Sequence, residues 1–191
     1  MNVLLSGVAG GGRTAFAGRL AEQFLRQGFL TGGFLCPSRT REGEGPASVI
    51  VDLLNGRSRP FGRRGRPEGV PGPGETAVGP WFLSASGFAF GAQAVGRAVT
   101  LKTPLVFLDE IGPLELDGGG FRWLADLLIR GPLQPPVLIG VVREASIPRI
   151  RALYPDRSFE VVPVDGASAE AVFLDLRRSM RGLGTQLREL R

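Results

Sequence analysis

The chain has 191 residues, 43% of them hydrophobic and 21% charged, with a formal net charge of +5; this composition excludes wholesale disorder, and the length suits a single domain over residues 1–191. No apolar run reaches the roughly 18–20 residues of a membrane-spanning helix, and the lack of any histidine excludes His-based triads and nearly every ordinary zinc site. The single cysteine, Cys36, excludes an intrachain disulfide framework and suits a reducing cytosol, so we expect a cytoplasmic protein with no membrane partner.

Strands and helices alternate along the chain. The apolar run 2–6 is a short strand that leads into a glycine-rich turn and a helix over 14–27, which ends at Gly28. The other expected strands are 33–36, 48–53, 81–83, 105–108, 137–142 and 159–164, and the other expected helices are 87–99, 121–129, 147–153 and one that begins after Asp165 or Ser168. That final helix is expected to bury a stripe formed by Val172, Leu176, Met180, Leu183, Leu187 and Leu190. The alternation, with several strands apolar throughout, predicts an α/β fold: a mostly parallel sheet covered by helices on both faces.

The segment 57–80 is rich in Gly, Pro and Arg and has no sustained periodicity, so we expect a long mobile loop there. Five arginines cluster between Arg57 and Arg66. A solvated loop is the first interpretation of this cluster, and a contact to an anion, a nucleotide or a nucleic acid is the alternative. Because the cluster contains a single aromatic residue, Phe61, rather than an interleaved aromatic platform, and no helix-turn-helix pattern is present, a nucleic-acid partner is not expected.

The sharpest local signal is a glycine-rich loop between the first strand and the first helix. It consists of Gly7, Val8, Ala9, Gly10, Gly11, Gly12, Arg13 and Thr14. The loop fits the phosphate-binding pattern G-x-x-x-x-G-K-[ST] at every position except one, where Arg13 replaces the lysine. Glycines let the backbone turn successive N–H groups toward one anion, and the helix start adds its dipole. We expect these residues to cradle the phosphates of a nucleotide, with Arg13 neutralising charge at the reacting phosphate and the Thr14 hydroxyl on a Mg²⁺ ion; a plain glycine-rich turn is the alternative.

Two carboxylates, Asp109 and Glu110, follow the apolar strand 105–108. In open α/β sheets, ligands bind at this carboxyl end of the strands. Asp109 is expected to hold Mg²⁺, usually through water, opposite Thr14. Glu110 is expected to be the catalytic group that orients and polarises a water for in-line attack on a γ-phosphate. The alternative is a pair of acids that cap a strand in solvent.

Four further charged residues stand near expected strand ends. Glu115 is expected to form a structural salt bridge, with support of the two carboxylates as the alternative. Arg143 follows the strand 137–142 and either senses the γ-phosphate or is merely solvated. The same two interpretations apply to Arg39 and Arg41, which follow the second strand.

Several of these stretches resemble one known family. The most specific is FLDEIGPLEL, which is similar to the family block D-E-I-G-[KP]-[ML]-E-L. Further likenesses are carried by GGFLCPSRTREGE, VIVDLLNGRSRPFGRR, AVGPWFLSASGFAFGAQAV and VLIGVVRE. Together with the N-terminal loop, they resemble the small nucleoside-triphosphatase family of thermophilic archaea and bacteria, which has a human cancer-related nucleoside-triphosphatase as a relative.

The resemblance implies a P-loop fold with an extra strand between the loop strand and the acidic strand. It also implies Mg²⁺-dependent hydrolysis of ATP, GTP and related nucleotides to the diphosphate, with broad base tolerance. By position, the loop from Gly7 to Thr14 would cradle phosphate, Asp109 would manage Mg²⁺ and Glu110 would activate water. The sequence departs from the family at Arg13, at Val142 where relatives often carry histidine, and in the long Gly/Pro-rich segment.

A slow nucleoside triphosphatase acting on ATP or GTP is therefore the leading hypothesis. A nucleotide-binding protein that barely hydrolyses, a switch or accessory factor, is the main alternative, which Arg13 favours and Glu110 opposes. A small P-loop kinase is the third, because the arginine-rich segment could serve as a lid. The sequence identifies no protein partner.

Overall fold

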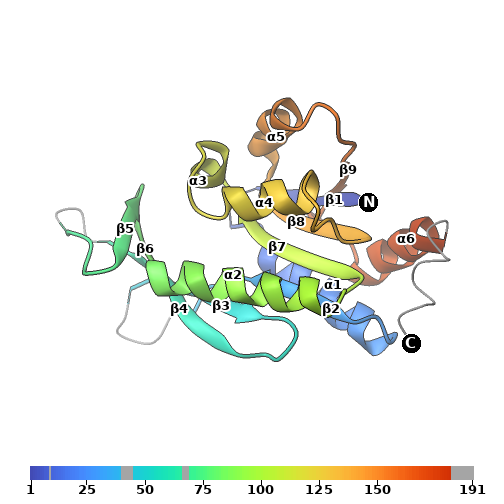
Figure 1. The fold of residues 1–191 in the computed structure, drawn as a ribbon, viewed down its shortest axis with the longest axis horizontal. Coiled ribbons are helices and arrows are strands. Elements are labelled where there is room, and N and C mark those ends of the chain that lie inside the picture. The colour runs from blue at the N-terminus through green and yellow to red at the C-terminus, as the bar shows by residue number, and fades with distance from the viewer. Residues whose placement is uncertain (9, 40–44, 66–68, 182–191) are drawn as a thin grey trace.

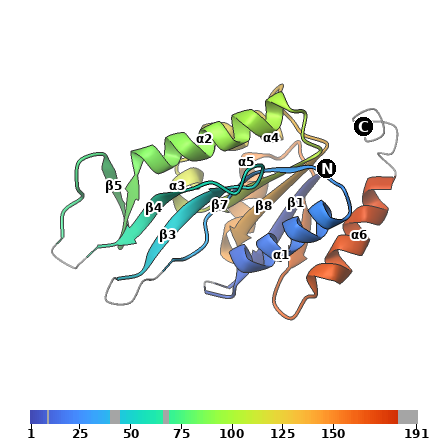
Figure 2. The same ribbon diagram turned by 90° about the horizontal axis from the view of Figure 1, so that it is seen from below.

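One mixed sheet runs through the protein in the computed structural model, with helices on both faces (Figures 1 and 2). The structure describes residues 1–8, 10–39, 45–65 and 69–181. In spatial order, the strands within these ranges are β5 (Glu75–Val78), β6 (Trp81–Ser84), β4 (Ser58–Arg64), β3 (Ala47–Asp52), β2 (Thr31–Leu35), β7 (Leu105–Ile111), β8 (Val137–Arg143), β1 (Asn2–Gly7) and β9 (Glu160–Pro163).

The five strands from β2 to β9 are parallel and form the half of the sheet that carries the candidate site. β8 pairs with β1 on one side and with β7 on the other, so one strand separates the loop strand from the acidic strand. The register places Gly7 opposite Arg143 and Asp109 opposite Val141. The end of β1 and the carboxylates of β7 therefore meet at the same edge of the sheet, as in open α/β folds that bind ligands there.

The helices bury two separate cores against the sheet. On one face lie α1 (Arg13–Arg26) and α6 (Ala169–Arg181); on the other lie α2 (Ala85–Thr100), α3 (Pro113–Leu116), α4 (Arg122–Ile129), the short η1 (Glu144–Ser146) and α5 (Ile147–Leu153) (Figure 2). Successive residues of β7 serve both cores, since Val106 and Leu108 face α2 and α4 while Leu105 and Phe107 face α1. This alternation explains why residues 105–108 of β7 are all apolar. The expected three-layer α/β architecture is confirmed.

The expectation of an irregular loop over 57–80 is wrong. Within the described part of this segment, β4 and β5 form antiparallel ladders with β3 and β6. Arg63 of β4 lies over the ring of Phe82, 4.7 Å from its centroid, and donates two hydrogen bonds to Glu75 at 2.8 and 2.5 Å. Pro60 fits because the ladder with β3 shifts register there, where a missing N–H costs little. Arg66 lies outside the described residues.

Most other expected elements are present with boundaries shifted by a few residues. Gly28 follows α1 with φ of +81°, the left-handed conformation that a helix end favours. In α6, Val172, Leu176 and Met180 are buried as expected, whereas Leu183, Leu187 and Leu190 lie outside the described residues. The four-residue α3 was not expected. In the described part of the chain, no helix is both long and apolar enough to cross a membrane.

Candidate active site

The glycine-rich loop leaves β1 and turns directly into α1. Gly10 and Gly12 have φ of +77° and +73°, conformations that L side chains rarely adopt. The N–H of Gly11 closes the turn on the carbonyl of Val8 at 3.1 Å. Gly12 is the N-cap of α1 and no side chain caps the helix start. The first N–H groups of α1 therefore offer an uncapped positive end to an anion. Ala9 lies outside the described residues.

Arg13 folds back over this loop. Its Nη1 donates to the carbonyl oxygens of Gly7, at 2.6 Å, and Val8, at 3.1 Å. Desolvation lowers the pKa of Arg13, and the positive charge of Arg143 acts in the same direction, while nearby carboxylates including Asp109 oppose it. The side chain thus lies against the loop and within electrostatic range of the carboxylates, and part of its hydrogen-bonding capacity is used by the backbone.

Asp109 is buried at the end of β7, with 1% of its surface exposed. Its Oδ2 accepts the backbone N–H of Cys36 at 2.7 Å. Desolvation raises the pKa of this carboxyl, and the N–H of Cys36 and the hydroxyl of Thr14 act against that shift. Its Oδ1 is buried and has no hydrogen-bond partner among the described residues. A carboxylate oxygen left in this state beside a hydroxyl fits a divalent cation, because such an ion supplies the missing interaction.

The cation would need further ligands from outside the protein. The described residues contain no group of three or more His, Cys, Asp and Glu side chains arranged to hold a metal. Mg²⁺ accepts such a site, since it commonly keeps several waters and binds one or two carboxylates together with substrate phosphates. Thr14 and Asp109 are the two side chains that fit this role.

Glu110 differs from its neighbour in both backbone and environment. Its φ is +67°, and the ladder between β7 and β8 shifts register between Asp109 and Ile111. The residue as a whole has exposed surface, whereas Asp109 is buried, but protein surrounds much of the Glu110 carboxyl group. Desolvation by the surrounding protein, then the negative charges of Asp109 and Glu115, raise the pKa of Glu110 to about 7, and Arg143 and Arg13 oppose the shift. A carboxylate with this pKa is suited to accept a proton near neutral pH.

The prediction that Glu115 forms a salt bridge is wrong, because its carboxylate has no ion-pair partner among the described residues. Its carboxylate is buried and accepts the backbone N–H of Gly112 at 3.0 Å and of Phe121 at 3.2 Å. Glu115 thereby connects Gly112, which precedes α3 and lies two residues after Glu110, to Phe121, which precedes α4. This role was hard to foresee, because backbone N–H groups leave no signal in the sequence.

The three arginines predicted near strand ends differ in how close they lie to the site. Arg143 ends β8 opposite Gly7 and is close enough to influence the pKa of both Arg13 and Glu110. Arg39 lies in the connection from β2 to β3, where its backbone N–H donates to the carbonyl of Ala47. Arg41 lies outside the described residues.

One residue at the loop was not identified from the sequence. The carboxylate of Asp165 stands so close that a Cβ on Gly7 or Gly11 would lie 3.0–3.3 Å from its oxygens. Asp165 follows β9, which pairs in parallel with β1. An acidic residue after a parallel strand was the available signal, but the segment was interpreted only as a helix start.

These features define a class of protein. A glycine-rich loop between β1 and α1, with an acidic strand one position removed from β1, is the arrangement of a P-loop nucleoside-triphosphatase fold. A family model described as NTPase matches residues 2–176. The chain belongs to this family, and the resemblance to nucleoside-triphosphatase enzymes is confirmed.

Relatives from archaea are named Nucleoside-triphosphatase THEP1. The protein of Methanothermobacter thermautotrophicus is 26% identical over 183 residues, which cover 96% of this chain and 99% of the relative. The protein of Methanopyrus kandleri is 32% identical over 120 residues, 63% of this chain and 62% of the relative, so that match spans less than two thirds of the relative's length.

Two solved structures share the fold. The crystal structure of THEP1 from the hyperthermophile Aquifex aeolicus matches with a TM-score of 0.65 and 17% identity, covering 92% of this chain and 96% of that one. The solution structure of a human cancer-related nucleoside triphosphatase matches with a TM-score of 0.65 and 22% identity, covering 95% and 97%.

Proposed function

We propose that this protein hydrolyses ATP, GTP and related nucleoside triphosphates to the diphosphate and phosphate, slowly and with little discrimination between bases, in a Mg²⁺-dependent reaction. The observation that carries the proposal is the buried Oδ1 of Asp109, which has no partner among the described residues and lies on the carboxylate that the Thr14 hydroxyl influences. Family membership supports the same reaction, and the archaeal relatives are named without reference to any one base.

The loop binds the triphosphate. The uncapped N–H groups at the start of α1, after the left-handed Gly10 and Gly12, converge on an anion. Arg13 lies beside this point and adds positive charge when its guanidinium turns from the carbonyls of Gly7 and Val8 toward the phosphates. Thr14 and Asp109 would hold Mg²⁺, which would neutralise charge on the terminal phosphates.

Glu110 prepares the attacking water. Its carboxylate accepts a hydrogen bond from the water and holds one lone pair of the water oxygen toward the γ-phosphate. With a pKa of about 7, Glu110 can also accept the proton that this water loses. The bond between the β–γ bridging oxygen and the γ-phosphorus breaks as the new bond from water forms, and the nucleoside diphosphate leaves.

A second candidate is supported by the position of Arg13. A guanidinium held by two loop carbonyls is larger and less mobile than the lysine of the usual pattern. If it does not leave those carbonyls, the protein binds nucleotide with little turnover and acts as a switch or an accessory factor.

Phosphate release from ATP and GTP distinguishes the two candidates. We expect the wild type to release phosphate with Mg²⁺ and not with EDTA. Glu110→Gln should lower kcat about 10²- to 10⁴-fold, as loss of a general base does, while nucleotide binding measured by calorimetry persists. The exposed Glu170→Gln on α6 is the matched control and should leave kcat unchanged.

The same assay with Arg13→Lys tests the second candidate. If the wild type binds nucleotide but releases no phosphate and Arg13→Lys restores release, the protein is a binder built on a hydrolase fold. If no variant binds nucleotide, both candidates are wrong.

A further inference from the structure

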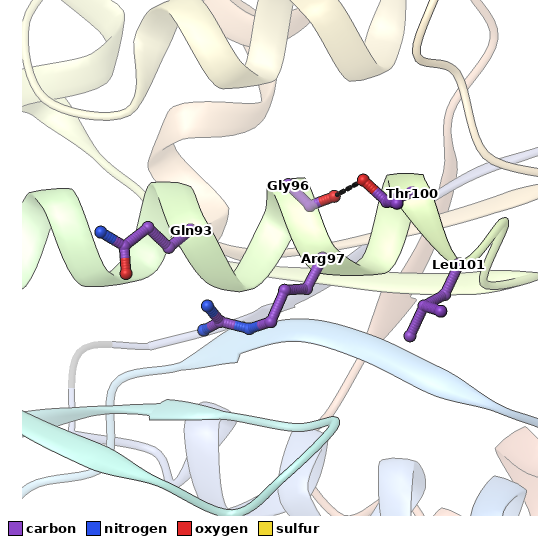
Figure 3. Close-up of a pocket in the computed structure, with 5 residues that line it drawn as sticks. All are labelled: Gln93, Gly96, Arg97, Thr100 and Leu101. Carbon is purple, nitrogen blue, oxygen red and sulfur yellow. Dashed lines mark hydrogen bonds between the residues drawn. The ribbon is translucent and has the colours of Figure 1, made fainter.

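A groove runs along the outer side of α2, beside the turn between β3 and β4. Two depressions open to solvent, of about 450 and 420 Å³, form it, and Gln93 and Arg97 border both. Figure 3 shows Arg97 reaching from the helix toward the neighbouring strands.

The groove carries an excess of positive charge. Arg57, Arg59 and Arg97 line it, and Arg57 and Arg59 are exposed. The carboxylate that faces Arg97 is the fully buried Asp52, whose Oδ2 accepts Nε at 3.0 Å and Nη2 at 2.7 Å. Among the described lining residues, three guanidinium groups face this one carboxylate, an excess of two positive charges. The two hydrogen bonds to Asp52 hold the Arg97 side chain in place, and its other N–H groups can donate to a ligand.

The other lining groups suit a ligand that is partly aromatic. Asn55 and Gln93 supply amides, and Ser58 supplies a hydroxyl. Phe90 supplies a half-buried ring, which lies 5.9 Å from the Arg97 guanidinium carbon. Guanidinium groups recognise phosphate oxygens, and a flat aromatic wall beside them accepts a base.

This groove is separate from the glycine-rich loop. Antiparallel β3 pairs Leu35 with Val51 and then Phe34 with Asp52, so it moves away from the edge where Cys36 contacts Asp109. The turn with the arginines follows Asp52. Figure 2 shows α2 over the sheet face opposite α1, the helix that follows the loop. None of the groove's lining residues belongs to the described part of the loop.

We propose that this groove is a second nucleotide-binding site, in which Arg57, Arg59 and Arg97 bind a phosphate group and Phe90 contacts the base. The site does not depend on the reaction assigned to the loop. It gives a ligand-binding role to part of the arginine cluster that the sequence marks out between Arg57 and Arg66.

Amide chemical shifts locate binding directly. Titration of the ¹⁵N-labelled protein with AMP at fixed ionic strength should shift the signals of Gly56, Gln93 and Gly96 and yield a dissociation constant for the groove. Signals of Gly10 and Gly12 report separately on the loop, so failure of one site does not hide the other. Ribose 5-phosphate should produce the same groove shifts with weaker affinity, because it carries the same phosphate group without a base.

Matched variants identify the contacts. Arg59→Ala and Arg57→Ala should each weaken AMP binding at the groove about tenfold, the value of a charge-assisted hydrogen bond. Arg151→Ala removes the same charge from an exposed position on α5 and should leave the affinity for AMP unchanged. Phe90→Leu keeps an apolar side chain and should abolish the preference for AMP over ribose 5-phosphate.

Three results would overturn the proposal. One is AMP shifts confined to the loop. Another is an equal loss of affinity in Arg151→Ala, which would indicate general charge attraction. The last is binding of single-stranded oligonucleotides that tightens steadily with length and far exceeds AMP, since the groove would then serve nucleic acid.

Discussion

Two adjacent acidic residues, Asp109 and Glu110, acquire different properties from their surroundings. Asp109 is buried and accepts the N–H of Cys36, whereas Glu110 is exposed in a left-handed backbone conformation. Neighbouring carboxylates in unlike environments can divide the roles of ion ligand and base. The residue type alone would not distinguish them, because both side chains carry the same group.

The pKa of Glu110 can be tested without a substrate. In the wild type, ¹³C titration of its carboxyl should give a pKa of about 7. Glu115→Gln removes one of the negative charges that raise this value and should move the Glu110 titration to lower pH. Glutamine has one acceptor oxygen, so it keeps only one of the bonds from Gly112, to Oε2, and Phe121, to Oε1, and circular dichroism should first check that the variant is folded.

The activity assigned to Glu110 should follow the same titration. Because the deprotonated carboxylate is the active form, kcat/KM for ATP should fall as the pH drops below about 7, and the midpoint should shift down in Glu115→Gln. A wild-type profile with no inflection between pH 6 and 8 would contradict the role of Glu110 as a base.

At the scale of single elements, β2 shows how a close backbone approach determines residue choice. Gly33 has φ of +84°, and a Cβ there would overlap the carbonyl oxygen of Phe107 on the neighbouring strand. Gly32 beside it leaves room for Ala98 of α2. The glycines thus bring α2 and β7 close to β2, the strand that leads to Cys36.

Gly33→Ala should therefore destabilise the protein by about 4 kcal/mol or more, because strain and a backbone overlap combine. Urea denaturation followed by circular dichroism measures the loss. Gly18→Ala on α1 is the matched control: its Cβ would meet Leu35 at an ordinary 3.8 Å, and it should stabilise the protein by about 0.5–1 kcal/mol. Equal behaviour of the two variants would show that the contact with Phe107 is relieved at little cost.

At the scale of the whole molecule, an ion pair joins the antiparallel half of the sheet to its covering helix. Asp52 at the end of β3 is fully buried, and Arg97 of α2 is 39% exposed. Asp52 also accepts the N–H of Leu54, which shapes the turn after β3. The pair therefore anchors both the added strands and the groove beside them.

Arg97→Met should cost about 2–3 kcal/mol, less than the 3–5 of a fully buried pair because Arg97 is partly exposed. The double variant with Asp52→Asn should recover part of this loss, since no unpaired charge is left inside. Arg26→Met, which breaks the exposed pair with Glu22, should cost at most about 0.5 kcal/mol. Additive effects of the Asp52 and Arg97 changes would contradict direct coupling.

Local signals in the sequence identified much of the fold and of the candidate site. Apolar periodicity predicted the parallel strands and the long helices, and glycine spacing predicted the loop before α1, because both depend on neighbours along the chain. The antiparallel strands β4 and β5 were missed, since the Gly, Pro and Arg that suit edge strands and turns also suit irregular loops. Their pairing depends on contacts such as Arg63 with Glu75.

By itself, the sequence determined the class of fold, the phosphate-type loop and the identity of the acidic pair. Only the tertiary structure decided that Arg13 folds onto the carbonyls of Gly7 and Val8, that Glu115 caps backbone N–H groups and that Asp165 stands beside the loop. These outcomes depend on which backbone groups come within hydrogen-bonding distance. That distance is set by the packing of strands and helices far apart in the chain.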